Sequence, residues 1–223
     1  MTSVTLVFDL DGTLAHTAPD LHAATNHVLD TAGRERVDFQ TIAALIGHGA
    51  GPMIKGAFAA TGDAPTDDQM QDLNRVFLNY YREHLTDHSE LFPGVEAALH
   101  RWKALGARLA VCTNKRHEFT MPVLERLGIL PLFDGVRSAD SADYRKPDAR
   151  HLIDAVNDAG GDLKRAVMIG DSLTDTTTAK NAEVPSIAVT FGYRNGTVES
   201  LGADRIISHY DMLDRAVREL LDL

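Results

Sequence analysis

The chain contains 223 residues with a formal net charge of −10 at pH 7, and 44% of its residues are apolar. This length suffices for one large globular domain or for a core with a smaller appendage. The acid excess argues against nucleic acid as a partner, because phosphate backbones bind to basic surfaces. The N-terminus lacks a basic leader, and no segment approaches the roughly 18 apolar residues of a membrane span. We therefore expect a cytoplasmic protein without a membrane or nucleic-acid partner.

A short apolar run near the N-terminus predicts a buried strand over residues 4–8. The run ends in Asp9-Leu10-Asp11-Gly12-Thr13, where the glycine predicts a turn. If the strand stops there, Asp9 and Asp11 can direct their carboxyl groups toward one point instead of toward opposite faces of a sheet.

Residues 16–88 contain several helical patterns and no convincing strand, which is far more chain than the roughly 12 residues that a crossover between parallel strands needs. Helices are predicted between residues 19 and 33, between residues 38 and 47, and from Thr66 onward. We interpret this segment as an inserted α-helical cap domain. The core domain then consists of residues 1–15 and 89–223.

The chain after the insert alternates between helical and strand patterns. Helices are predicted over residues 95–105, 119–127, 149–159 and 174–182, and strands over residues 108–112, 166–169 and 186–190. This alternation predicts a doubly wound, Rossmann-like α/β fold, in which helices cover both faces of a parallel sheet. Ligands of such sheets lie beyond the carboxyl ends of the strands.

Four aspartates are expected at that edge of the sheet. Asp9 and Asp11 follow the first strand, whereas Asp171 and Asp175 follow the strand at residues 166–169. Carboxylates that converge at one point repel each other unless a cation lies among them. Ligands that are all oxygen favour a hard ion, so the pattern predicts a Mg²⁺ site.

Two further side chains at the same edge complete a phosphate site. Thr113 follows the strand at residues 108–112 and supplies a hydroxyl group, and Lys146 supplies an ammonium group. Together with a metal ion and free backbone N–H groups at a turn, these groups are typical of phosphate binding.

Four segments of the chain, in this order, are similar to the four motifs of the haloacid-dehalogenase-like (HAD) phosphohydrolases. They are Asp9-Leu10-Asp11-Gly12-Thr13, Thr113-Asn114, Lys146-Pro147 and Gly170-Asp171-Ser172-Leu173-Thr174-Asp175. The resemblance covers essentially the whole chain, and the insert lies where that superfamily carries its cap. Finer similarity to the phosphoglycolate phosphatases extends to Gly47-His48-Gly49, Thr113-Asn114-Lys115 and Thr190-Phe191-Gly192-Tyr193.

The resemblance implies a role for each motif residue. Asp9 is expected to be the nucleophile and a metal ligand, and Asp11 the general acid and base, with its backbone carbonyl on the metal. Thr113 and the backbone of Asn114 are expected to bind the transferring phosphoryl group. Lys146 is expected to stabilise the charge of the phosphoryl group, and Asp171 to ligate the metal. Asp175 is expected to hold Asp171, Lys146 or a metal-bound water in place.

The cap glycines are a further expected contact with the substrate. Gly47, His48 and Gly49 can end a helix, or they can let backbone N–H groups approach a carboxylate-bearing substrate. The expected reaction is the Mg²⁺-dependent hydrolysis of 2-phosphoglycolate to glycolate and phosphate by a monomer or homodimer.

Other activities stay open at this point. Pyrophosphate, sugar phosphates and nucleotides are alternative small substrates, and a phosphosugar mutase shares the fold and the aspartate pair. Asp11 disfavours a haloacid dehalogenase, which needs no acid at that position. Lys55 is an unconvincing Schiff-base lysine for a phosphonoacetaldehyde hydrolase. A phospho-acceptor signalling domain has no reason to carry a cap of this size.

Overall fold

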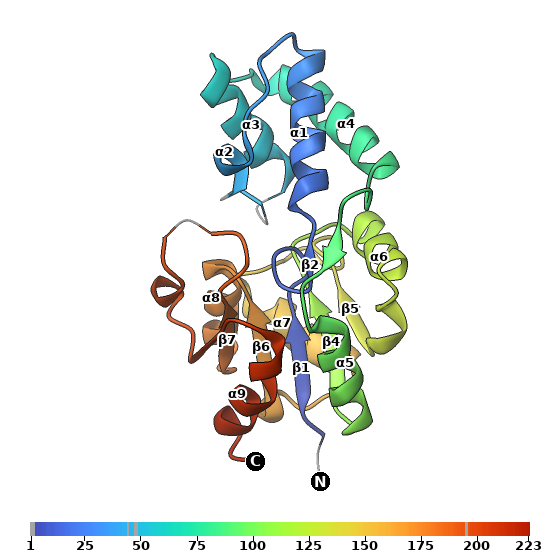
Figure 1. Cartoon of the computed structure of the whole chain (residues 1–223), viewed down its shortest axis with the longest axis vertical. Helices are drawn as coiled ribbons and strands as arrows, with labels where there is room; N and C mark the ends of the chain where they lie inside the picture. Colours follow the sequence, from blue (N-terminus) through green and yellow to red (C-terminus); the bar gives the residue numbers. More distant parts are fainter. Residues whose placement is uncertain (1–2, 44, 47–48, 195) are drawn as a thin grey trace. The chain divides into compact units, whose positions relative to one another are not determined.

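The structure is a computed structural model that describes residues 3–43, 45–46, 49–194 and 196–223. The chain divides into two compact units (Figure 1). One unit combines Met1–His16 with Leu91–Leu223, and the other is Thr17–Glu90. The short strands β2 (Ala15–His16) and β3 (Glu90–Leu91) pair where the chain passes from one unit to the other.

The first unit is built on a six-stranded sheet in which every strand pairs in parallel. Its order is β5-β4-β1-β6-β7-β8. The strands are β1 (Thr5–Phe8), β4 (Arg108–Cys112), β5 (Gly135–Arg137), β6 (Ala166–Gly170), β7 (Ser186–Val189) and β8 (Arg205–Ile207). All residues of β1, β6 and β7 are buried, as expected for parallel strands with helices on both faces.

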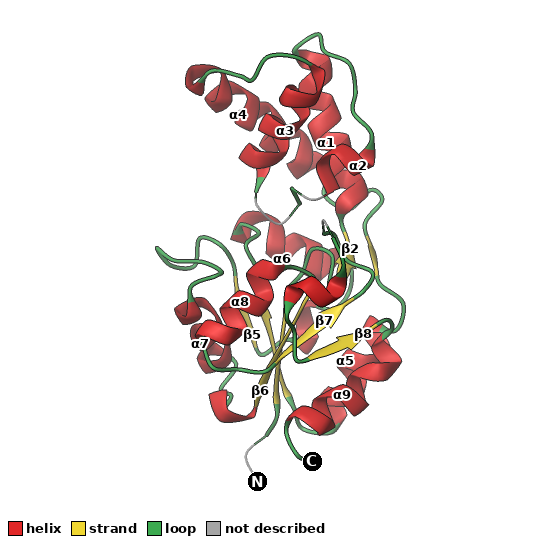
Figure 2. Ribbon diagram, turned by 90° about the vertical axis from the view of Figure 1, so that its left-hand side faces the viewer, coloured by secondary structure: helices red, strands yellow, loops and turns green. Residues whose placement is uncertain are grey.

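Helices cover both faces of this sheet (Figure 2). On one face lie α7 (Ala149–Asp158) and α8 (Leu173–Asn181), and on the other lie α5 (Val95–Ala104) and α9 (Leu213–Leu220). Alternate strand residues such as Val7, Ala110 and Met168 pack with Leu152 and Val156 of α7 in one buried cluster. The doubly wound parallel sheet confirms the predicted fold class.

The shorter elements complete the unit. Helix α6 (His117–Arg126) follows β4. Single 3₁₀ turns lie at Leu130–Leu132, Leu163–Arg165, Val198–Leu201 and Tyr210–Met212. None of the helices formed by the described residues combines the length and the apolar content that crossing a lipid bilayer requires.

The second unit is helical. It contains α1 (Ala18–Thr31), α2 (Phe39–Ala43), α3 (Ala50–Thr61) and α4 (Asp67–Glu83). Helix α4 begins as predicted after Thr66, whose hydroxyl accepts a hydrogen bond from the Gln69 amide while the Gln69 side chain accepts one from the Thr66 amide. Helices α1, α3 and α4 contact one another, and each contributes buried apolar residues such as Leu29, Ile54 and Phe77.

Asp20 joins the two ends of this helical unit. It lies in the first turn of α1 and is 1% exposed. Its carboxylate accepts a hydrogen bond from the His88 amide at 3.0 Å and another from the Ser89 hydroxyl at 2.6 Å. The start of α1 is therefore fixed to the chain that leaves the unit.

We expect Asp20→Ala to lower the free energy of unfolding by about 2–4 kcal/mol, because the His88 amide and the Ser89 hydroxyl lose their hydrogen bonds to a charged, buried acceptor. Urea unfolding followed by circular dichroism measures the change. Asp30→Ala is the matched control, since Asp30 lies on the same helix in an exposed ion pair with Arg36. An equal loss for both variants would contradict the importance of the Asp20 contacts.

Candidate functional site

The site is built where β1 ends. The Asp9 amide donates a hydrogen bond to the Ile169 carbonyl at 2.9 Å, so the pairing of β1 with β6 continues to Asp9. The chain then turns through Gly12, whose φ is +81°. A Cβ atom at Gly12 would overlap the Asp171 carboxylate, so only glycine allows the turn to pass this close.

Three aspartates bring their carboxylates together at this point. Asp9, Asp171 and Asp175 each place a carboxylate oxygen within 4.8 Å of the others, and all three are buried. Within the described parts of the chain, no other group of three acidic, histidine or cysteine side chains meets in this way. Glycines at 170 and 192 make room, because Cβ atoms there would collide with Asp175 and Asp171.

Lys146 lies between two of these carboxylates. Its ammonium nitrogen is 2.8 Å from Asp9 Oδ1 and 2.6 Å from Asp175 Oδ1, and the residue is 4% exposed. Burial alone lowers the pKa of a lysine, but the attraction of Asp175 and Asp9 outweighs it and raises the pKa of Lys146. Lys146 is therefore a permanent positive charge next to Asp9.

Asp175 is held by the first turn of α8. Its Oδ2 accepts hydrogen bonds from the Ser172 hydroxyl at 2.6 Å and from the Ser172 and Asp171 amides at 3.1 and 3.2 Å. The Ser172 hydroxyl in turn caps the helix by accepting from the Asp175 amide. Asp175 thereby positions both Lys146 and the loop that carries Asp171.

The site contains more negative than positive charge. Among the described residues of the first unit, four aspartates are buried but only two cations are, Lys115 and Lys146. Burial raises the pKa of Asp9 to about 6, although Lys146 opposes the shift. Burial also raises the pKa of Asp171, and repulsion from Asp175 and Asp9 adds to the effect. One divalent cation would balance the two excess charges, and the oxygen donors fit Mg²⁺.

Asp11 is not one of the three closely grouped carboxylates and contacts a different cation. The Lys115 ammonium is 3.1 Å from Asp11 Oδ1 and 3.3 Å from Oδ2, and both side chains are at least nine-tenths buried. Sequence reasoning assigned no role to Lys115. The signal available was its place directly after Thr113-Asn114.

Thr113 and Asn114 follow β4 and bind backbone carbonyl groups of neighbouring segments. The Thr113 amide extends the pairing of β4 with β5 by donating to the Arg137 carbonyl, and the Asn114 side chain donates to the Lys146 carbonyl at 3.1 Å. His151, which sequence reasoning missed, is buried on α7, and its Nε2 donates to the Thr113 carbonyl at 3.3 Å. The structure thus brings Thr113 and Asn114 to the same edge as Lys146.

The cap residues are placed less completely. Gly47 and His48 lie outside the described residues. Gly49 belongs to the second unit, where it immediately precedes α3 with a φ of +96° and an exposed position.

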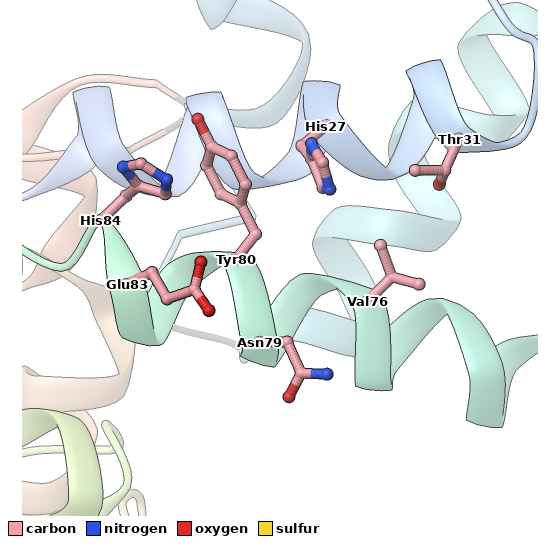
Figure 3. Close-up of a pocket in the computed structure, with 7 residues that line it drawn as sticks. All are labelled: His27, Thr31, Val76, Asn79, Tyr80, Glu83 and His84. Atoms are coloured by element: carbon pink, nitrogen blue, oxygen red, sulfur yellow. The ribbon is translucent and has the colours of Figure 1, made fainter.

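A groove of about 500 Å³ lies between α1 and α4 of the second unit (Figure 3). The Tyr80 ring stacks against His27 and His84, with ring centroids 4.3 Å apart in both pairs. None of the seven residues that line the groove is buried. The groove lacks the paired buried charges that distinguish the edge of the sheet.

Known proteins resemble the chain over almost all of its length. Residues 6–189 match the sequence model of a family described as haloacid dehalogenase-like hydrolase. A phosphoglycolate phosphatase from Agrobacterium fabrum (strain C58 / ATCC 33970) is 40% identical over 215 residues, covering 96% of this chain and 92% of that protein. A phosphoglycolate phosphatase from Caulobacter vibrioides is 41% identical over 222 residues, covering 99% and 93%.

Solved structures share the fold. The crystal structure of a predicted phosphoglycolate phosphatase from Haemophilus somnus 129pt has a TM-score of 0.90 at 28% identity and covers 97% of this chain and 98% of that chain. The structure of a β-phosphoglucomutase from Clostridium difficile has a TM-score of 0.78 at 19% identity and covers 99% of this chain and 97% of that chain. The second likeness extends to the fold alone.

We expect Mg²⁺ to raise the melting temperature of the wild-type protein, because a cation bound only by the folded state adds about 2.7 kcal/mol at 100 times its Kd. Asp171→Asn should abolish the rise, as measured by differential scanning fluorimetry with and without EDTA. Asp134→Asn is the control, because Asp134 pairs with Lys103 outside the cluster. If Asp171→Asn keeps the full response, the metal site lies elsewhere.

Cys112 should resist thiol reagents. It is fully buried on β4, and burial raises the pKa of its thiol to about 12, so the reactive thiolate is scarce at pH 8. We expect labelling by a disulfide reagent at pH 8 to be at least roughly a thousandfold slower in the folded protein than in urea. Rapid labelling of the folded protein would show that the strand is accessible.

Proposed function

We propose that this chain, which belongs to the haloacid dehalogenase-like hydrolase family and is a phosphatase, hydrolyses 2-phosphoglycolate. The products would be glycolate and phosphate, and the cofactor would be Mg²⁺. The substrate is supported by relatives that are 35–41% identical over nearly the full chain and carry the name phosphoglycolate phosphatase. One observation carries the chemistry. Asp9 lies buried at the end of β1, one of the two central strands, directly beside the ammonium group of Lys146.

In the proposed first step, Asp9 attacks phosphorus in line with the ester bond. The new bond joins an Asp9 carboxylate oxygen to phosphorus, and the bond from phosphorus to the glycolate oxygen breaks. Asp11 gives its proton to that oxygen, so glycolate leaves as an alcohol rather than as an alkoxide. The product on the enzyme is an aspartyl-phosphate.

In the second step, water attacks the phosphorus of the aspartyl-phosphate. Asp11, now a carboxylate, accepts a proton from this water, and the bond between phosphorus and the Asp9 oxygen breaks. Phosphate leaves, and both aspartates return to their starting states.

The remaining residues bind and orient the phosphoryl group. Lys146 stabilises the negative charge of this group, while the Thr113 hydroxyl and the backbone N–H of Asn114 donate to its oxygens. Asp9, the backbone carbonyl of Asp11, and Asp171 would hold Mg²⁺, with Asp175 holding Lys146 and the loop of Asp171 in place. The ion would offset the repulsion between the Asp9 carboxylate and the phosphate dianion.

The helical unit is proposed to be the cap of this enzyme. Within it, Gly47, His48 and Gly49 are proposed to contact the substrate through backbone N–H groups. The support for this assignment is that the segment forms a compact unit of its own, inserted between the first and second motifs.

A substrate panel tests the proposed activity. We expect 2-phosphoglycolate to have a higher kcat/KM than pyrophosphate, sugar phosphates and nucleoside monophosphates when phosphate release is measured with Mg²⁺. Turnover should stop with EDTA and return when Mg²⁺ is added. A panel in which phosphoglycolate ranks below another class would overturn the substrate and leave the phosphatase class intact.

Asp9→Asn should abolish turnover, because an amide oxygen is a poor nucleophile and a weaker partner for Lys146. The expected loss in kcat is at least roughly a thousandfold, with an unchanged circular dichroism spectrum. Asp72→Asn is the control, since Asp72 is an exposed aspartate of α4. Retained activity in Asp9→Asn would be incompatible with its role as nucleophile.

A further inference from the structure

Lys115 is a buried cation that the proposed mechanism does not use. Its side chain is 5% exposed, and its ammonium contacts both oxygens of Asp11, at 3.1 and 3.3 Å. Lys146, the other buried lysine among the described residues, contacts Asp9 and Asp175 instead. The two ammonium groups therefore serve different carboxylates of the site.

The backbone of Lys115 is held from two sides. Its amide donates to the Thr113 hydroxyl at 3.2 Å, and its carbonyl accepts from the Ala139 amide at 2.9 Å and from the Thr120 hydroxyl at 3.3 Å. The side chain thus starts from a fixed point beside the residue proposed to bind the phosphoryl group. Such anchoring suits a group that must recognise a ligand in one orientation.

The position of Asp11 defines where the leaving group lies. An in-line attack by Asp9 places the departing oxygen on the opposite side of phosphorus, within hydrogen-bonding distance of the acid that protonates it. Whatever is attached to that oxygen therefore lies close to Asp11 and to the cation beside it. In 2-phosphoglycolate a single methylene separates this oxygen from a carboxylate.

From this juxtaposition we propose that Lys115 determines specificity by binding the carboxylate of the leaving group. The inference rests on the proposed function and deepens it, because it assigns recognition of the acid to a residue of the core unit. A lysine ammonium carries three N–H donors and can bridge two carboxylates, as Lys146 does between Asp9 and Asp175. Esters without a carboxylate lack this contact, so Lys115 favours phosphate esters of short hydroxy acids.

The test compares two esters with leaving groups of similar size. One is 2-phosphoglycolate and the other is 2-hydroxyethyl phosphate, in which a neutral hydroxymethyl group replaces the carboxylate. Lys115→Met removes the charge and keeps much of the side-chain length. Lys115→Gln also keeps a hydrogen-bond donor for Asp11, and serves if the first variant does not fold.

We expect either variant to lower the preference for phosphoglycolate, expressed as the ratio of the two kcat/KM values, by about 30- to 100-fold. The kcat/KM for 2-hydroxyethyl phosphate should fall by a smaller factor, which reports the loss of the contact with Asp11, so the ratio isolates recognition of the carboxylate. Inhibition by glycolate should weaken in parallel, and Lys115→Arg should restore part of the preference. Lys103→Met is the control, because it removes a lysine paired with Asp134 elsewhere in the core.

Two results would overturn the inference. If kcat/KM falls equally for both esters, Lys115 only positions Asp11. If the wild-type protein prefers phosphoglycolate and the Lys115 variants keep that preference, the proposed function stands and another residue recognises the carboxylate. A wild-type protein without preference between the two esters would instead refute the proposed substrate, and the inference with it.

Discussion

Repulsion among buried carboxylates is the constraint on which this structure depends. Four aspartates lie buried in the core unit, and two lysines are the buried cations that the described residues provide there. Burial makes each uncompensated charge costly, which is why the pKa values of Asp9 and Asp171 are raised. Such an arrangement is stable only where cations are supplied at fixed positions, and that requirement suits a phosphate-handling site with a divalent metal.

The parallel sheet supplies the precision that this charge arrangement needs. Asp9 and Asp171 follow adjacent strands, β1 and β6, whose register is fixed by pairing from Thr5 to Phe8. Close packing then requires glycine at the turn after β1 and in the loop after β7, where a Cβ atom would overlap Asp171. Asp175 lies in the first turn of α8, where the Ser172 cap fixes its position beside Lys146. Small errors in any of these elements would separate the ion pairs of Lys146.

Regular, buried elements could be predicted from the sequence, and short, partly exposed ones could not. The apolar run at residues 108–112 matches β4, whereas β5 and β8 have three residues each and include exposed or half-buried positions, so they show no apolar run. Helix α3 follows a glycine-rich segment and α9 has only eight residues, and neither was anticipated. The ion pair of Lys115 with Asp11 joins residues 104 positions apart, which no local pattern reveals.

The sequence by itself determined the fold class, the family and the set of chemical groups at the carboxyl edge. It did so because strand periodicity and motif order are local properties of the chain. The tertiary structure decided which cation serves which carboxylate, since those distances depend on strand order and on the approach of α8. Lys146 contacts Asp9 and Asp175, while Lys115 contacts Asp11. Only the folded chain therefore shows that these acidic and basic residues form two sets of ion pairs, one around each lysine.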